Sequence, residues 1–189
     1  MDQNIFLIGL NHKTAGVEVR ERYALSECLP EFESIIPVGG PDNPITESLV
    51  LSTCNRVEII AVGYGDEVKD QILSIWAETR GQSPEDLEPF VYIHKDLDAI
   101  KHVFTVASSL DSMVVGEPQI LGQLKTAYKD AVKQNTAKVI LNRLLHKAFS
   151  VAKRVRTETS IGSSAVSISY AAVELAKRIF ADMDKRRAM

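Results

Sequence analysis

A cysteine followed two residues later by an arginine is the feature of this sequence best suited to chemistry. Cys54 and Arg56 lie in the octet LSTCNRVE, residues 51–58. The thiolate is the nucleophilic form of cysteine, and a nearby guanidinium favours it. Free cysteine is also common in protein cores, so the same pattern is compatible with a small packing residue beside a solvated arginine. The spacing by itself leaves both interpretations open.

The elements around Cys54 predict that it lies at a junction between two strands. Residues 48–51 and 57–62 are apolar runs of strand length with few residues between them, which indicates an antiparallel hairpin. Further strands are expected at 5–8 and 90–93, and helices at 26–36, capped by Ser26, and at 67–80. The order β-α-β-β-α-β is that of a ferredoxin-like fold. A turn on such a sheet is a suitable platform for a reactive side chain.

The second half of the sequence predicts helices throughout. Apolar stripes at helical spacing run over 96–110 and 137–157, Pro118 begins another helix, and Ser163 or Ser164 caps a last one over 165–183. We therefore expect an α+β protein in three parts. Residues 1–94 form the ferredoxin-like subdomain that bears the nucleophile, 95–157 form a helical part of the catalytic domain, and 158–189 form a linker helix.

The composition excludes several classes of protein. The chain has 189 residues, of which 45 % are hydrophobic and 25 % charged, with a formal net charge of −3. This is a soluble globular composition, and it argues against binding to nucleic acid by bulk charge. No secretory signal or apolar run of membrane length occurs, so a cytoplasmic location is expected. No metal-ligand spacing occurs either, and the second cysteine, Cys28, is interpreted as a packing residue.

Four blocks of the sequence, in order, resemble the glutamyl-tRNA reductase family. They are GLNHKTA at 9–15, LSTCNRVE at 51–58, SLDSMVVGEPQILGQ at 109–123, and the pair RVRTET at 154–159 and AVSI at 165–168. Members of this family use NADPH to reduce glutamate esterified to its tRNA. The product is glutamate-1-semialdehyde, and the step commits glutamate to 5-aminolevulinate and to porphyrin and other tetrapyrrole biosynthesis. The resemblance implies the same substrate, glutamyl-tRNA(Glu), for this chain.

The resemblance also implies roles for individual residues. Cys54 attacks the ester carbonyl, expels the tRNA and holds glutamate as a thioester. His102 polarises the carbonyl or moves a proton, and Arg56 grips the substrate carboxylate with its planar fork. The expected substrate-binding set is Thr53, Asn55, Arg56, Ser112, Glu117, Gln119 and Gln123. Asn11 and His12 are weaker candidates for the wall of the pocket.

Simpler interpretations of these residues stay open. His102 could be an idle exposed histidine, Thr53 and Asn55 could hold a tight turn, and Ser112, Glu117 and Gln119 could begin a helix. A basic stripe on the predicted helix 137–157 comprises Arg143, Lys147, Lys153 and Arg154, with His146 beside them. It could follow a tRNA backbone or be a solvated face.

The family's dinucleotide-binding fingerprint, G-x-G-x-x-G after a strand, does not occur in this sequence. We therefore expect a fragment that forms the thioester but cannot reduce it, with the NADPH-binding domain and a C-terminal homodimerisation domain missing. The aminomutase that follows in the pathway is a candidate partner. Two alternatives stay open: a cysteine hydrolase in which His102 and a carboxylate serve as the base, and a non-catalytic ferredoxin-like module that binds RNA or a regulator.

Overall fold

The computed structural model describes residues 3–25, 34–162 and 168–180. The strands are β1 (Asn4–Asn11), β2 (Ile45–Ser52), β3 (Arg56–Gly63) and β4 (Tyr92–Lys95). The helices are α1 (Val17–Arg22), α2 (Glu67–Thr79), α3 (Pro84–Leu87), α4 (Leu97–Ala107), α5 (Gln119–Lys133), α6 (Val139–Glu158) and α7 (Ile168–Ile179), with 3₁₀ turns η1 (Glu88–Phe90) and η2 (Ser160–Gly162).

The strands form one antiparallel sheet in the order β2-β3-β1-β4. This is the arrangement of a ferredoxin-like fold, so the α+β prediction is confirmed. Neighbouring side chains on a strand point to opposite faces, and both faces of β3 are buried along its whole length. Its residues 59–62 are accordingly a continuous apolar run rather than an alternating one, since helices cover both sides of the sheet.

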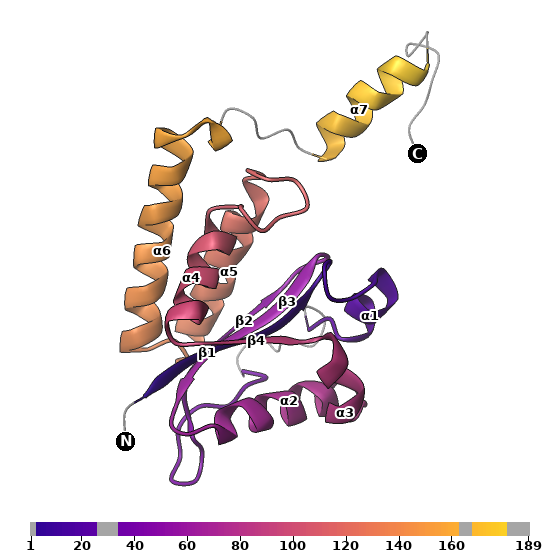
Figure 1. The fold of residues 1–189 in the computed structure, drawn as a ribbon. Coiled ribbons are helices and arrows are strands. Elements are labelled where there is room, and N and C mark those ends of the chain that lie inside the picture. The colour runs from indigo at the N-terminus through magenta and orange to yellow at the C-terminus, as the bar shows by residue number, and fades with distance from the viewer. Residues whose placement is uncertain (1–2, 26–33, 163–167, 181–189) are drawn as a thin grey trace.

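Helices cover both faces of the sheet (Figure 1), and an apolar core lies against each face. One core joins the sheet to α2 and α3 and contains Trp76, whose indole N–H donates to the Tyr23 carbonyl at 2.9 Å. The other joins Leu7, Leu49 and Ile60 of the sheet to α4, α5 and α6. The sheet is thus the middle layer of three, and the helices that follow it in sequence bury its second face.

Some element boundaries differ from those expected. The fourth strand begins at Tyr92 rather than Phe90, because residues 88–90 form a 3₁₀ turn whose first positions accept Pro89. Helix α1 was not predicted, since VEVRER at 17–22 alternates polar and apolar residues as a strand would. The predicted helix at 26–36 lies largely outside the described residues, together with Ser26 and Cys28; residues 35 and 36 form a bend. The predicted caps Ser163 and Ser164 also lie outside them.

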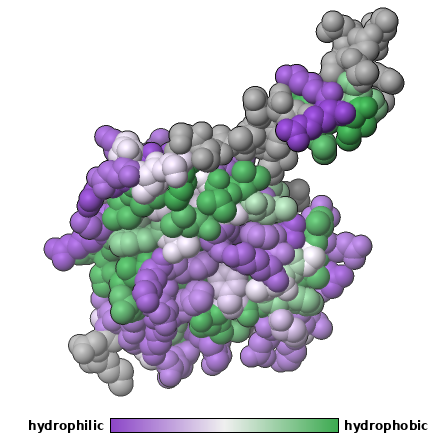
Figure 2. All heavy atoms as spheres, turned by 45° about the horizontal axis from the view of Figure 1, so that its top comes forward, coloured by the Kyte–Doolittle hydropathy of each residue, from purple (hydrophilic) through white to green (hydrophobic). Residues whose placement is uncertain are grey.

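Helix α7 stands apart from the rest of the chain in Figure 1. Apolar side chains gather along one side of it and polar ones along the other (Figure 2). The apolar side chains of Val173, Leu175 and Ile179 are exposed. Among the described residues, no helix has both the length and the apolar character needed to cross a membrane.

Candidate active site

Cys54 lies at the tip of the turn between β2 and β3, with its side chain exposed. The Thr53 hydroxyl accepts hydrogen bonds from the backbone N–H groups of Asn55 at 3.2 Å and Arg56 at 3.1 Å. The Thr53 N–H donates to the Arg56 carbonyl at 2.8 Å. Thr53 therefore holds the tight turn that presents the thiol, as a short side-chain oxygen does in many turns.

Two residues from other elements fix the position of this turn. The His12 N–H, just beyond β1, donates to the Asn55 carbonyl at 3.0 Å. The buried side chain of Arg20, on α1, donates from Nε to the Cys54 carbonyl at 3.1 Å and from Nη1 to the Ala15 carbonyl at 2.7 Å. Sequence reasoning missed Arg20, because an arginine in a short helix gives no sign of a contact so far along the chain.

The exposed thiol faces a small pocket between the hairpin turn and the start of α5. The pocket is lined by His12, Thr53, Cys54, Asn55, Arg56, Ser112, Met113, Glu117, Gln119, Ile120 and Gln123. Apart from His102 and the buried Asn11, every residue that the sequence suggested for catalysis, substrate binding or the pocket wall lies in this lining. Backbone N–H groups in the first turn of α5 add a preference for negative charge at the pocket.

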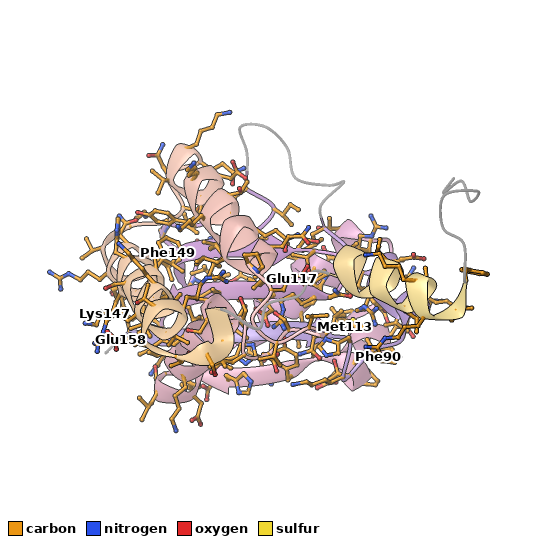
Figure 3. All side chains as sticks on the ribbon, turned by 90° about the horizontal axis from the view of Figure 1, so that it is seen from above. Phe90, Met113, Glu117, Lys147, Phe149 and Glu158 are labelled. Carbon is orange, nitrogen blue, oxygen red and sulfur yellow. The ribbon has the colours of Figure 1, made fainter. Side chains whose placement is uncertain are left out.

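One wall of the pocket is the connection between α4 and α5, residues 108–118. Ser109 has a φ of 61°, and its hydroxyl donates to the Glu117 carbonyl at 2.6 Å. The Gly116 N–H donates back to the Ser109 carbonyl at 3.0 Å. Seen from above, Glu117 lies near the middle of the molecule, and Met113 lies closer to Phe90 (Figure 3). The connection is thus closed by its own hydrogen bonds above the sheet.

Beneath the pocket, a buried carboxylate gathers three donors. Glu58 Oε1 accepts hydrogen bonds from Arg56 Nη1 at 2.7 Å and Tyr92 Oη at 2.5 Å, and it lies 2.7 Å from His102 Nε2. We call Arg56, Glu58, Tyr92 and His102 the Glu58 cluster. Gly9 on β1 lies between Glu58 of β3 and Tyr92 of β4 in the sheet. A Cβ atom at Gly9 would lie 2.7 Å from Glu58 Cγ. Only glycine leaves room for the cluster.

The cluster sets the protonation of its members. Burial by itself would raise the pKa of Glu58, but the hydrogen bond from His102 and the positive charge of Arg56 outweigh it and hold that pKa below its usual value. Burial and the Glu58 charge raise the pKa of the Tyr92 phenol. Glu58 is therefore ionised and Tyr92 neutral near pH 7, and Tyr92 acts as a hydrogen-bond donor.

A second carboxylate holds the other side of Arg56. Arg56 Nη2 donates to Asp111 Oδ2 at 3.0 Å and to the Asp111 carbonyl at 2.5 Å. Asp111 also pairs with Lys13. Burial would raise the pKa of Asp111, but the hydrogen bonds from Lys13 and Arg56 outweigh it and lower it. Arg56 thus joins β3 to the wall of the pocket. Sequence reasoning overlooked Glu58 and Asp111, although Glu58 follows Arg56 at the two-residue spacing that puts both on one face of a strand.

His102 lies outside the pocket lining and belongs to the Glu58 cluster. Its ring stacks on His94, with centroids 4.9 Å apart. It is neither exposed nor idle, and Glu58 and Arg56 connect it to the pocket. In the described part of the chain no hydrogen bond joins Cys54 to a histidine, so the Cys–His pair that the hydrolase alternative needs is not formed here.

The basic residues expected to meet tRNA all lie on the exposed surface of α6. Arg143, Lys147, Lys153 and Arg154 are exposed, and Figure 3 places Lys147 and Glu158 on the outer side of the molecule. Arg154 pairs with Glu158 through two hydrogen bonds of 2.9 and 3.1 Å, so part of its charge is neutralised. No cluster of three or more potential metal-ligating side chains occurs within the described ranges.

The fold and the pocket define a class of protein: a ferredoxin-like α+β domain, covered by helices on both faces, that presents a cysteine to a polar pocket from a hairpin turn. Residues 8–159 match the family described as "Glutamyl-tRNAGlu reductase, N-terminal domain". The chain therefore belongs to the family of glutamyl-tRNA reductase N-terminal domains.

Individual relatives agree with this assignment. The chain is 67 % identical over all of its 189 residues to a glutamyl-tRNA reductase of Oleidesulfovibrio alaskensis, covering 41 % of that protein. It is 66 % identical, again over its whole length, to one of Nitratidesulfovibrio vulgaris, covering 42 %. A solved structure of glutamyl-tRNA reductase from Methanopyrus kandleri matches 92 % of the chain and 39 % of its own, with 34 % identity and a TM-score of 0.63. The chain thus spans about two fifths of the length of these relatives.

Proposed function

We propose that this chain carries out the acyl-transfer half of the glutamyl-tRNA reductase reaction, with Cys54 as the nucleophile. The observation that carries the proposal is the exposed thiol of Cys54 at the mouth of a pocket lined by Ser112, Glu117, Gln119 and Gln123. A structural cysteine would be buried among apolar side chains. Cys54 is instead held at a turn tip by three surrounding segments, with polar groups opposite.

In the proposed step the Cys54 sulfur attacks the ester carbonyl of glutamyl-tRNA. A C–S bond forms, the C–O bond to the terminal ribose breaks, and glutamate stays on the protein as a thioester. The first-turn N–H groups of α5 suit the negative charge that develops on the carbonyl oxygen. Glu117 is an acceptor for the substrate ammonium, and the amides of Gln119 and Gln123 supply further hydrogen bonds.

The substrate carboxylate goes to Arg56 in this proposal. The guanidinium already bonds Glu58 and Asp111, whose side chains are 1 % and 13 % exposed. Asp111 is the partner nearer to solvent and lies on the connection that walls the pocket. We expect the substrate carboxylate to displace Asp111 from Nη2 while Glu58 keeps the guanidinium plane in place, since a carboxylate bonds the planar fork well.

For the whole reductase the proposal includes NADPH as reductant, glutamate-1-semialdehyde as product and a place in tetrapyrrole biosynthesis. The residues described here do not fit a dinucleotide. Over 3–25, 34–162 and 168–180 no strand leads through G-x-G-x-x-G into a helix that could receive a pyrophosphate. We therefore assign this chain no step that involves NADPH. A cytoplasmic location, homodimerisation and contact with the aminomutase that uses the product belong to the same proposal.

The acyl-transfer step is tested by trapping the thioester. The chain is incubated with glutamyl-tRNA, quenched in acid and digested, and the peptides are weighed by mass spectrometry. We expect a glutamyl adduct on the peptide that contains Cys54. Cys54→Ser abolishes it, and Cys28→Ser, the same change at the second cysteine, leaves it in place. An adduct that persists in Cys54→Ser, or none in the wild type, would overturn the proposal.

A further part of the proposal concerns tRNA. The exposed cations of α6 would follow its phosphates, because phosphate contacts release counterions and depend steeply on salt. Reversing Lys147 to Glu should weaken tRNA binding and lower the magnitude of the slope of log K against log salt by about 1. The control is Lys69→Glu on α2, which lies against the opposite face of the sheet. Equal effects of both changes would mean that α6 has no particular role.

A further inference from the structure

The proposed acyl transfer leaves one proton without a carrier. The Cys54 thiol must lose a proton as it attacks, and the departing ribose oxygen must gain one. The inference that follows rests on the proposed function and identifies the residue that moves this proton. His102 is poorly placed for it, because its Nε2 lies 2.7 Å from Glu58 Oε1 and its ring does not line the pocket.

His12 stands beside the nucleophile. Asn11 and Arg56 are partners in the β1–β3 register, and the next step along both strands brings His12 opposite Asn55, with its N–H bonded to the Asn55 carbonyl at 3.0 Å. Asn55 is the immediate neighbour of Cys54. The ring of His12 lines the same pocket as the thiol. Backbone pairing thus fixes His12 beside Asn55, and its ring and the Cys54 thiol line one pocket.

The ring of His12 has an unused polar atom. Its Nδ1 is buried and has no hydrogen-bond partner among the described residues. Leaving a buried polar atom unpaired costs about 1–3 kcal/mol, so such atoms are rare in folded proteins and need an explanation. Within the described residues, no hydrogen bond to Nδ1 therefore fixes which ring nitrogen carries the proton. A histidine that accepts a proton and then returns it needs this freedom, and His102 lacks it.

The charges around His12 favour its neutral form. Burial and, next, the positive charge of Arg56 lower the pKa of His12. Asp111 opposes them, and the charges of Lys13 and Arg20 add smaller lowering effects. Glu117 is the carboxylate that lines the same pocket from the opposite wall. A neutral imidazole is a base at pH 7, and an imidazolium formed beside these cations gives its proton up readily.

We propose that His12 carries the proton of the acyl transfer, from the thiol of Cys54 to the leaving oxygen of the tRNA ribose. The S–H bond breaks as the C–S bond forms, and the imidazole holds the proton as a cation. The C–O bond then breaks, and the proton passes to the ribose oxygen as a hydroxyl hydrogen. His12 ends neutral, so the step balances without any other reactant.

The test compares single-turnover acylation of Cys54 in the wild type and in His12→Asn, in the full-length protein with NADPH withheld. Asparagine places an amide near the position of Nδ1, so it can form a hydrogen bond there but cannot carry a proton. The backbone bond to Asn55 is retained. With glutamyl-tRNA we expect acylation to slow by about 100-fold or more. Lys69→Asn on α2, which lies against the opposite face of the sheet, should leave the rate unchanged.

A second substrate separates proton transfer from positioning. A thiophenyl thioester of glutamate releases a thiolate that needs no proton. At a pH where alkylation shows Cys54 to be ionised, this thioester should acylate Cys54 of the His12→Asn variant at close to the wild-type rate. With glutamyl-tRNA the variant should stay slow at a pH where Cys54 keeps its proton, because that proton must then still reach the ribose oxygen. Equal slowing with both substrates, or a rate with glutamyl-tRNA within about twofold of wild type, overturns the assignment of His12.

Failure of the inference and failure of the proposed function look different. If wild-type protein forms no Cys54 adduct with glutamyl-tRNA, the proposed function is wrong and the role of His12 fails with it. If wild-type protein forms the adduct and His12→Asn forms it equally fast, only the inference is wrong.

Discussion

Glu58 holds one side of the Arg56 guanidinium beneath the pocket. Its side chain is 1 % exposed, and its sequence neighbours on β3 are apolar. Its Oε1 atom accepts hydrogen bonds from Arg56 and Tyr92 and contacts the ring of His102. A buried carboxylate is costly unless donors surround it. The cluster satisfies that condition, and it places His102 in contact with the carboxylate that accepts a hydrogen bond from Arg56 beneath the pocket.

Replacing Glu58 with Gln should destabilise the protein by about 3 kcal/mol near neutral pH, because Arg56 loses a buried ionic partner. The folded pKa of Glu58 is depressed, so its contribution is complete above the unfolded value of about 4.3 and is lost as the pH falls through the folded value. Urea unfolding of both proteins between pH 3 and 7 should therefore show a difference that is constant at the upper end and shrinks in acid. A difference that grows as the pH falls would contradict the ionised assignment.

Asp111 competes with the substrate carboxylate for Arg56, if the proposed binding mode is right. Asp111→Asn removes the competing charge while retaining the size and most hydrogen bonds of the side chain. We expect the glutamyl-tRNA concentration that gives half-maximal acylation of Cys54 to fall several-fold. This corresponds to about 1 kcal/mol of tighter binding. The stability should change little, since Asp111 is the more exposed partner. Weaker binding in Asp111→Asn would show that Asp111 holds the pocket in shape rather than occupying the carboxylate site.

At the level of secondary-structure elements, the sequence predicted the features that depend on residues close together in the chain. The hairpin of β2 and β3 and the start of α5 after Pro118 follow from apolar periodicity and from proline chemistry, and both were expected. The contacts that lock the hairpin could not be expected, because they join residues distant in sequence. Arg20 reaches Cys54 across 34 residues, and Arg56 reaches Asp111 across 55. No periodicity encodes such pairs.

Helix α6 provides another case of a distant contact. Its N-cap position, Lys138, makes no side-chain capping hydrogen bond. The buried Glu47 on β2 accepts instead from the backbone N–H groups of Lys138 at 2.9 Å, Ile140 at 2.9 Å and Leu141 at 2.8 Å. A carboxylate at this end also complements the helix dipole. One side chain therefore both caps α6 and joins it to the edge strand of the sheet.

Glu47→Ala should lower the free energy of unfolding by about 2–3 kcal/mol, because it leaves three backbone donors without their acceptor at a partly buried helix end. Chemical denaturation with circular dichroism measures the change. Glu18→Ala is the matched control: Glu18 is also an acidic residue near a helix start, but it is exposed on α1 and should change stability by less than about 0.5 kcal/mol. Equal effects of the two substitutions would mean that the three hydrogen bonds of Glu47 contribute little.

For the whole molecule, the question is whether the sheet and the helices after it fold as one unit. The sequence divided the chain at residues 94 and 157, and that division stays a prediction. The second core draws Leu7, Leu49 and Ile60 from the sheet and Leu141 and Leu145 from α6. Because this face of the sheet is apolar, separating the helices from it would expose a large hydrophobic surface to water. We expect residues 4–158 to unfold cooperatively.

Trp76 makes this expectation testable, because it is the only tryptophan and lies in the core on the opposite face of the sheet from α6. Leu145→Ala opens a cavity beneath α6 and should cost about 3 kcal/mol. If the layers unfold together, the Trp76 fluorescence transition moves to lower urea by the same amount as the helical circular dichroism signal, although the substitution touches nothing near Trp76. Leu175→Ala, at a leucine 58 % exposed on α7, should move neither. A Trp76 transition that stays in place while the helical signal moves would show two units, and the pocket of Cys54, which draws residues from both, would then lie between parts able to separate.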